Sequence, residues 1–122
     1  RMSPSLIEPE AAELAIQYSG GVFREMARIM RTSIGRARRR KASIIEVTDI
    51  EWSATEIRNE YRRILDKEDI KLLRRIYKTK RLEYVDRLRP LMQLLAVLEY
   101  REYSNGENWC DIHPVLRNLI NV

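Results

Sequence analysis

The sequence predicts a mainly α-helical protein in two parts, a three-helix bundle over residues 1–65 and a smaller helical unit over residues 66–122 that ends in one β-hairpin. Two observations support this prediction. Apolar residues recur three and four positions apart through most of the chain, which is the period of an amphipathic helix. After Leu95 the apolar period changes to two, around the dipeptide Asn105-Gly106, which is typical of a tight hairpin.

The composition fits a soluble protein of one domain or of two very small ones. Hydrophobic residues make up 44% of the 122 residues and charged residues 34%, enough for a core and a well-solvated surface. Cys110 is the only cysteine, so the chain forms no internal disulfide and suits a reducing compartment. No apolar run reaches the roughly 18 residues that cross a bilayer, and no signal-peptide pattern opens the chain. We therefore expect a cytoplasmic protein without a membrane partner.

Helix signals divide the first half of the chain. Glu8-Pro9-Glu10 starts a first helix, because proline is tolerated in the first turn and acidic residues favour the positive end of the helix dipole. Ser19-Gly20-Gly21 ends it, and Ser19 is also a candidate cap for a second helix over about residues 21–39. That second helix has one apolar side, and its other side carries arginines. The apolar side consists of Val22, Met26, Ile29, Met30, Ile34 and Ala37, and the basic side of Arg24, Arg28, Arg31 and Arg38.

A short β-branched connector over residues 42–47 leads to the third helix. Thr48-Asp49-Ile50-Glu51 matches the capping box, in which the threonine hydroxyl and the glutamate carboxylate bind backbone N–H groups at a helix start. The helix is expected to end near Leu65. Its predicted buried face consists of Ile50, Ala54, Ile57, Tyr61 and Ile64.

The second half contains shorter elements. A helix is predicted from Asp66 or Lys67 to about Lys80, and another from Asp86, as its cap, to about Leu95. The segment Pro114–Ile120 is predicted to form a short terminal helix. Helices followed by a two-stranded wing are typical of a winged-helix-like unit.

The hairpin register is predicted from the pairing that keeps apolar side chains on one face. A three-residue loop, residues 104–106, pairs Leu98 with Ile112 and Tyr100 with Cys110, which meets this condition. On the other face this register places Arg101 opposite Trp109, close enough for a cation–π contact.

The sequence offers little for catalysis. His113 is the only histidine, and with Cys110 it gives too few soft ligands for a zinc site or a Cys/His nucleophile. We therefore expect Cys110 to be a core residue and His113 a turn residue, with no metal and no catalytic residue. A P-loop needs a glycine, four residues and then Gly-Lys-Ser/Thr, and the four glycines at positions 20, 21, 35 and 106 do not provide it. This chain alone is therefore not expected to be an enzyme that binds a triphosphate.

A basic cluster closes the second predicted helix. Its cations are suited to nucleic-acid phosphates, but cations at a helix C-terminus are also favoured by the helix dipole alone, on a merely solvated surface. The helix that would enter a DNA groove, residues 86–95, is mostly apolar with only Arg87 and Arg89 near its start, which argues against reading of base sequence. The cluster consists of Arg36, Arg38, Arg39, Arg40 and Lys41.

The order of elements from the first helix to the third resembles the lid of AAA+ ATPases. The match rests on a helix, the Ser19-Gly20-Gly21 turn, Arg24 in the next first turn, a long helix, a short connector and a third helix. It is most similar to the origin-recognition and bacterial relatives, in which a winged helix follows the lid. The segment Asn108–Pro114 is similar to the wing of bacterial AAA-type ATPases that have a winged-helix-like C-terminal cap.

This resemblance implies a role for the glycine turn. In the family, the second lid helix carries the sensor 2 arginine, which contacts the phosphates of ATP bound with Mg²⁺ to the preceding P-loop domain. By position that arginine is Arg24, with Ser19, Gly20 and Gly21 forming the turn before it. The implied partner is an upstream P-loop domain of the same parent chain. Arg1 precedes Met2, so we expect an excised fragment or a tag remnant at the start.

Three functions remain open from the sequence. The first is the C-terminal, nucleotide-sensing part of a larger AAA+ ATPase. The second is a stand-alone winged-helix protein that binds DNA through the basic cluster and the wing near Asn105. The third is a structural interaction module with Trp52 or Trp109 at its interface. In the second and third, Gly20-Gly21 is only a turn between helices and Arg24 is a solvated surface residue.

Overall fold

The computed structural model describes residues 6–102 and 104–120. Within these residues the protein is mainly α-helical with one two-stranded antiparallel sheet, as the sequence predicts. It divides into two compact units, residues 1–59 and 60–122, and the division falls inside the third helix. The elements are α1 (Pro9–Ser19), α2 (Phe23–Arg39), α3 (Val47–Ile64), α4 (Lys67–Thr79), α5 (Leu88–Gln93), β1 (Val97–Arg101), β2 (Asn108–Ile112), the 3-10 helix η2 (Pro114–Leu116) and α6 (Arg117–Ile120).

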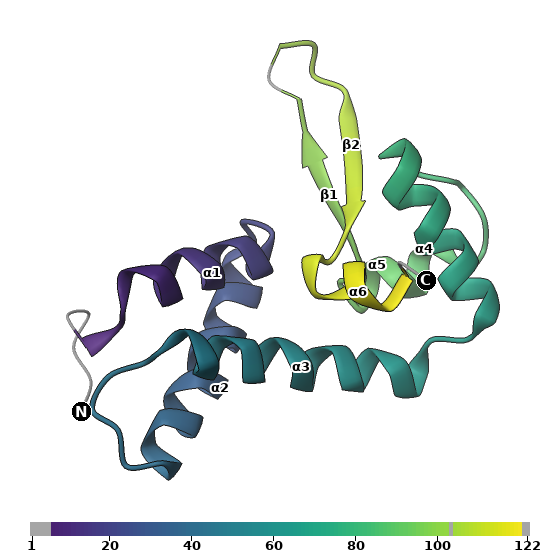
Figure 1. Ribbon diagram of the computed structural model, residues 1–122. Helices are drawn as coiled ribbons and strands as arrows, with labels where there is room; N and C mark the ends of the chain where they lie inside the picture. Colours follow the sequence, from purple (N-terminus) through teal and green to yellow (C-terminus); the bar gives the residue numbers. More distant parts are fainter. Residues whose placement is uncertain (1–5, 103, 121–122) are drawn as a thin grey trace. The chain divides into compact units, whose positions relative to one another are not determined.

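The first unit is built from α1, α2 and the first part of α3 (Figure 1). Ala11 and Ala15 are buried on α1, where their small side chains let this helix lie against α2. The segment before α1 is fixed by a parallel β-bridge between Ile7 and Ile45, which lies in the connector between α2 and α3. The connector predicted as extended is therefore tied to the start of the chain's first helix.

The turn between α1 and α2 differs from the prediction in one respect. Gly20 ends α1, as predicted, and has the left-handed conformation, but α2 begins at Phe23 rather than near Gly21. Ser19 does not cap α2: its hydroxyl donates to the Ile16 carbonyl at 2.7 Å and accepts from the Gly21 N–H at 3.2 Å. Because this hydroxyl is engaged by the end of α1, it is not available to the N–H groups of α2.

Small and polar residues line the contact between α2 and α3. Ile29 and Ala37 of α2 are fully buried, as predicted, and Ile50 of α3 is fully buried as well. Between them, the hydroxyls of Ser33 and Ser53 lie 2.8 Å apart and form a buried hydrogen bond. This pair satisfies two hydroxyls that would otherwise be costly to bury.

The capping box predicted at the start of α3 is wrong. The helix begins at Val47, and Thr48 is an exposed helical residue. The buried carboxylate of Asp49 accepts from the Glu46 N–H at 2.9 Å, so Asp49 takes the part expected of Glu51, two residues earlier in the chain. At the other end of α3, Ile64 is 54% exposed and does not belong to the buried face predicted for it.

The second unit begins with the end of α3 and with α4. Asp66 caps α4 through a capping box with Asp69, and Leu72, Leu73 and Ile76 form its buried face. The cap predicted at Asp86 is wrong: Arg87 precedes α5, no side chain caps the helix, and α5 has only six residues. In the segment that joins α4 to α5, residues 80–84 form neither helix nor strand.

The hairpin is present, but its predicted register is wrong by one residue. Tyr100 lies opposite Trp109 and Arg101 opposite Asn108, and beyond the strands the Glu102 N–H donates to the Glu107 carbonyl at 2.7 Å. The predicted cation–π pair is replaced by Tyr100 and Trp109, which stack with their ring centroids 4.6 Å apart. The predicted register assumed that the buried side chains of the hairpin all lie on one face. This assumption fails because α4 packs against β2 and α5 against β1, so the consecutive residues Val97 and Leu98 are both buried.

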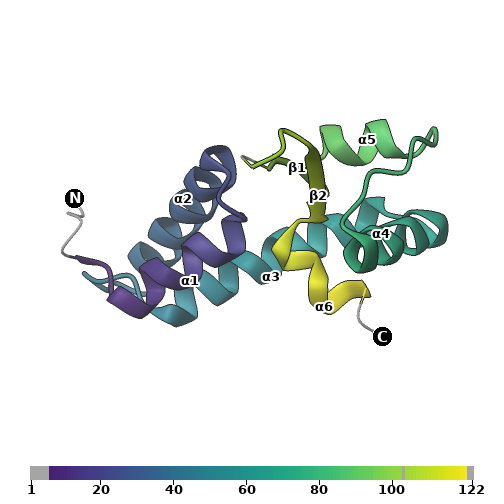
Figure 2. The same cartoon turned by 90° about the horizontal axis from the view of Figure 1, so that it is seen from above.

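The chain after the hairpin forms η2 and α6, as predicted for residues 114–120. Figure 2 shows α6 beside α4, and the Arg74 Nε of α4 donates to the Ile120 carbonyl at 3.0 Å. His113 is fully buried and starts η2 by accepting the Val115 N–H at its Nδ1. Its ring contacts Tyr61, whose hydroxyl donates to the Leu94 carbonyl at 2.6 Å.

Candidate functional site

The first candidate site is the turn that precedes α2. Gly20 and Gly21 both have positive φ angles, 63° and 78°. A side chain at Gly21 would meet no atom within 4 Å, so glycine is required there by the backbone conformation and not by crowding. The open space beside Gly21 leaves the backbone at the entrance of α2 accessible to a ligand or a neighbouring domain.

Arg24 lies in the first turn of α2, directly after this entrance. Its side chain is exposed, and it makes no hydrogen bond or ion pair with any residue in the described parts of the chain. The next residue, Glu25, is 2% exposed and binds Arg28 at 3.4 Å. Arg28 is therefore engaged by a buried carboxylate, whereas Arg24 extends into solvent.

Two apolar side chains flank the same turn. Phe23, the residue before Arg24, is 86% exposed, and Ile16 in the last turns of α1 is 56% exposed. Large apolar side chains exposed to this extent on both sides of one turn are typical of a surface that another protein part covers. The sequence did not reveal this pair, because Phe23 falls at the helix start, where the 3.6-residue period gives no prediction of burial.

The second candidate site, the basic cluster at the end of α2, is not a single surface of available cations. Arg40 binds the buried Asp49 through its Nε, 2.9 Å from Oδ1, and also lies 3.1 Å from Glu46. The guanidinium groups of Arg36 and Arg39 each lie 5.1 Å from the ring centroid of Trp52 on α3. Three of the five cluster residues thus have a structural partner, which the sequence did not reveal because those partners come from the next helix and its connector.

The remaining cations form a row along α2. Arg24, Arg31 and Arg38 are exposed and lie seven residues apart, and their side chains have no hydrogen-bond or ion-pair partner among residues 6–102 and 104–120. Seven residues are almost two helical turns, so the three side chains leave the same side of α2 about 10 Å apart. Lys41, directly after the helix, is also exposed.

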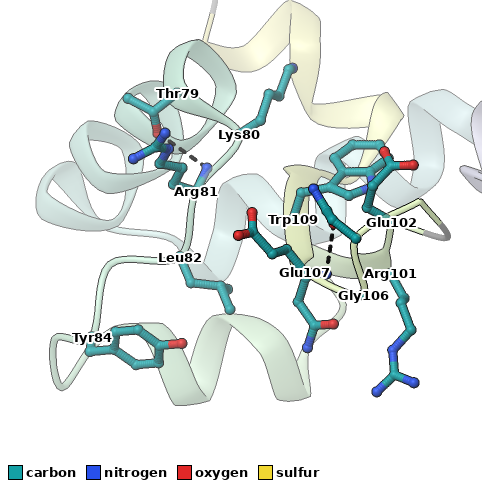
Figure 3. A pocket seen from close by; sticks show the side chains of 12 residues that line it. Thr79, Lys80, Arg81, Leu82, Tyr84, Arg101, Glu102, Gly106, Glu107 and Trp109 are labelled. Carbon is teal, nitrogen blue, oxygen red and sulfur yellow. Dashed lines mark hydrogen bonds between the residues drawn. The ribbon is translucent and has the colours of Figure 1, made fainter.

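Within the second unit, a groove lies between the hairpin and the segment that follows α4 (Figure 3). Arg81, Leu82 and Tyr84 form one wall, and Glu107 and Trp109 lie on the other. Trp109 is 38% exposed, so part of its indole ring faces solvent although it stacks on Tyr100.

The residues considered for catalysis are structural. Cys110 is fully buried, as predicted, and burial raises the pKa of its thiol to about 11, so the thiol is protonated at neutral pH. His113 is likewise buried in the turn where the sequence placed it. Within the described part of the chain, no three histidine, cysteine, aspartate or glutamate side chains form a group suited to a metal ion.

Comparisons with protein families, with curated proteins and with solved structures found no match for this chain. Among residues 6–102 and 104–120, none of the helices has the length and apolar character needed to cross a membrane. The assignment of a function therefore rests on the geometry of the two candidate sites.

Proposed function

We propose that this chain is the C-terminal part of a larger AAA+ type ATPase, in which α1, α2 and α3 form the lid and Arg24 senses the nucleotide. The observation that carries the proposal is Arg24, an exposed arginine without a partner among the described residues, directly after two glycines of positive φ. A helix N-terminus favours phosphate, and a guanidinium fork matches phosphate oxygens. The order of elements that resembles the AAA+ lid adds support.

The chain supplies only one edge of such a site. ATP and Mg²⁺ need a P-loop domain, whose glycine–lysine motif this sequence does not contain. In the proposed assembly the P-loop domain precedes this chain in the same polypeptide and covers Phe23 and Ile16. Arg24 then stabilises charge on the phosphoryl group that is transferred and couples the lid to the nucleotide state.

In this proposal the second unit is a winged-helix-like cap for contacts with other domains or partners. The helical segment α4 and α5 followed by the β1–β2 hairpin supports this interpretation. The short α5 does not favour recognition of base sequence, because Arg87 at its start is engaged by Asp66 and Asp69 at 2.8 and 3.0 Å.

The proposal is tested by steady-state ATP hydrolysis in the protein that joins this chain to its P-loop domain. Replacing Arg24 by alanine is expected to lower kcat by about 100- to 1,000-fold, the usual cost of removing one donor to a developing charge. Arg31→Ala is the matched control, because Arg31 is also exposed on the same helix, and the kcat of this variant is expected to stay within about twofold of that of the unmodified protein. Equal rates for Arg24→Ala and the unmodified protein would reject the role of Arg24.

A second candidate function, binding to nucleic-acid phosphates, is favoured by the row of exposed arginines on α2. The residues that would bind phosphate are Arg31, Arg38 and Lys41 rather than Arg36, Arg39 and Arg40, whose guanidinium groups are engaged by Trp52, Asp49 and Glu46. In a titration with duplex DNA at several salt concentrations, Arg31→Ala/Arg38→Ala is expected to reduce the slope of log K against log salt by about 2, because two phosphates are no longer neutralised by the protein. Absence of binding at low salt would remove this candidate.

A further inference from the structure

The groove of the second unit lies at the outer edge of β2. One edge of β2 pairs with β1, and on the other edge the Cys110 N–H donates to the Lys80 carbonyl at 3.0 Å. The Lys80 ammonium group also binds the Asp111 carboxylate at 2.9 Å. Lys80, the residue that ends α4, is thus attached to β2 at two points.

The next backbone position along this edge is open. Residues two apart in a strand point their N–H groups to the same side, so the Asn108 N–H points away from β1, as the Cys110 N–H does. The Asn108 N–H has no hydrogen-bond partner in the described parts of the chain, and Asn108 lines the groove. The edge therefore offers an unpaired donor and its neighbouring carbonyl toward the opposite wall.

That opposite wall is the connector 81–84, which consists of Arg81, Leu82, Glu83 and Tyr84. Its side chains alternate between charged and apolar, as in a strand with one buried face, yet it forms no strand. Tyr84 is 89% exposed. Glu83 is held by Arg75 of α4, with the Arg75 Nε 3.0 Å from its carboxylate, and this ion pair fixes the connector on its own side of the groove.

We propose that the connector 81–84 closes onto β2 as the third strand of the sheet, with Leu82 opposite Asn108. The groove extends from Lys80 toward residues 105–109, so pairing that continues from the existing Cys110–Lys80 bond is antiparallel. In that direction the next pair is Leu82 and Asn108, which exchange two backbone hydrogen bonds. Tyr84 then lies beyond the end of β2, near the turn that contains Gly106.

Closure changes what the second unit presents to its surroundings. In the open form the outer edge of β2 is exposed and is a template for pairing with another chain, and in the closed form residues 81–84 cover this edge of β2. The Arg75–Glu83 ion pair favours the open form, but it is solvent-exposed and weak. The closed form gains two backbone hydrogen bonds and the burial of Leu82. This inference is independent of the nucleotide-sensing role of Arg24.

Disulfide trapping in the full chain tests the register of closure. Two introduced cysteines, Leu82→Cys and Asn108→Cys, in a Cys110→Ala background are expected to oxidise at least about 10-fold faster than the pair Arg81→Cys and Asn108→Cys. The control pair shares the cysteine at position 108 and closes a loop only one residue longer. However, the side chain of residue 81 points to the opposite face of the strand from that of residue 82. Equal rates, or a faster control pair, would overturn the proposal.

Amide hydrogen exchange in a protein that keeps Cys110 gives a second test that does not depend on the cysteine variants. The Asn108 amide is expected to exchange more slowly than an unstructured amide, because the closed form takes part in the equilibrium, and Glu83→Gln is expected to slow it by about a further two- to fivefold, by releasing the connector. Glu68→Gln is the control, because it removes an exposed ion pair, Glu68 with Lys71, that lies within α4. This variant should leave the exchange rate of the Asn108 amide unchanged. Exchange of Asn108 at the unstructured rate in both the unmodified protein and Glu83→Gln would show that the third strand does not form.

Discussion

Asp49 is the buried carboxylate that joins the end of α2 to the start of α3. It binds Arg40 and accepts the Glu46 N–H, and its side chain has no exposed surface. The hydrogen bonds from Arg40 hold the pKa of the Asp49 carboxyl below its usual value, although burial acts in the opposite direction. A carboxyl whose pKa is lowered by folding adds stability above its unfolded pKa, and this stability is lost as the pH falls through the folded value.

We therefore predict a pH-dependent effect of Asp49→Asn. Near pH 7 the variant should unfold about 5 °C below the unmodified protein, since it lacks a buried charged acceptor. The difference should shrink as the pH falls below about 4, the usual aspartate pKa, because Asp49 of the unfolded chain is then protonated while folded Asp49 stays ionised to lower pH. Thermal unfolding followed by circular dichroism from pH 2.5 to 7 measures both midpoints. A difference that stays constant over this range would contradict the assignment of an ionised Asp49.

At the same scale, the candidate site was only partly predictable. The sequence correctly suggested that Arg24 lies in the first turn of the helix after two glycines, because glycine, helix period and charge are local signals. It could not reveal that Arg36 and Arg39 lie over Trp52, since this contact depends on how α2 packs against α3. A run of arginines read from sequence therefore overestimates the number of cations available to a ligand.

At the scale of elements, the glycines of α2 and of the turn before it should respond oppositely to alanine. Gly21→Ala is expected to destabilise the protein by about 1 kcal/mol, because its φ of 78° disfavours a side chain even where space is open. Gly35→Ala, inside α2, is expected to stabilise by about 0.5–1 kcal/mol, because a Cβ there would make only an ordinary contact with Arg39 at 3.7 Å. Urea unfolding of both variants gives the comparison. Stabilisation by Gly21→Ala would show that the turn does not need a left-handed residue.

Element boundaries were predictable where a local signal marks them, and less so where tertiary packing decides. The ends of α1, α2 and α4 follow from glycine, charge and a capping aspartate within a few residues. The start of α3 was misplaced because Thr48 and Glu51 form a valid local pattern, but Arg40 fixes Asp49 instead. The hairpin register was misplaced because α4 packs against β2 and α5 against β1, and the consecutive residues Val97 and Leu98 are both buried, so alternation of apolar residues no longer identifies one face.

At the scale of the whole molecule, the chain contains two compact units, and buried apolar residues occur in each. The mainly α-helical class and the single hairpin follow from periodicity, which is averaged over many residues and tolerates local errors. Function does not follow from periodicity, because the proposed site is completed by a P-loop domain that this sequence does not contain. What the chain provides is one exposed arginine at the entrance of α2, beside an exposed Phe23.

The central claim is that Arg24 senses the phosphates of a bound nucleotide, and the most direct measurement is the ratio of the Kd for ADP to the Kd for ATP. It is determined by calorimetric titration of the protein that joins this chain to its P-loop domain, for the unmodified protein, Arg24→Ala and the control Arg31→Ala. An arginine that binds the terminal phosphate favours ATP, so Arg24→Ala is expected to lower the ratio by about 10-fold, equivalent to about 1.4 kcal/mol, while Arg31→Ala leaves it unchanged. A ratio that is the same in all three proteins would contradict the claim.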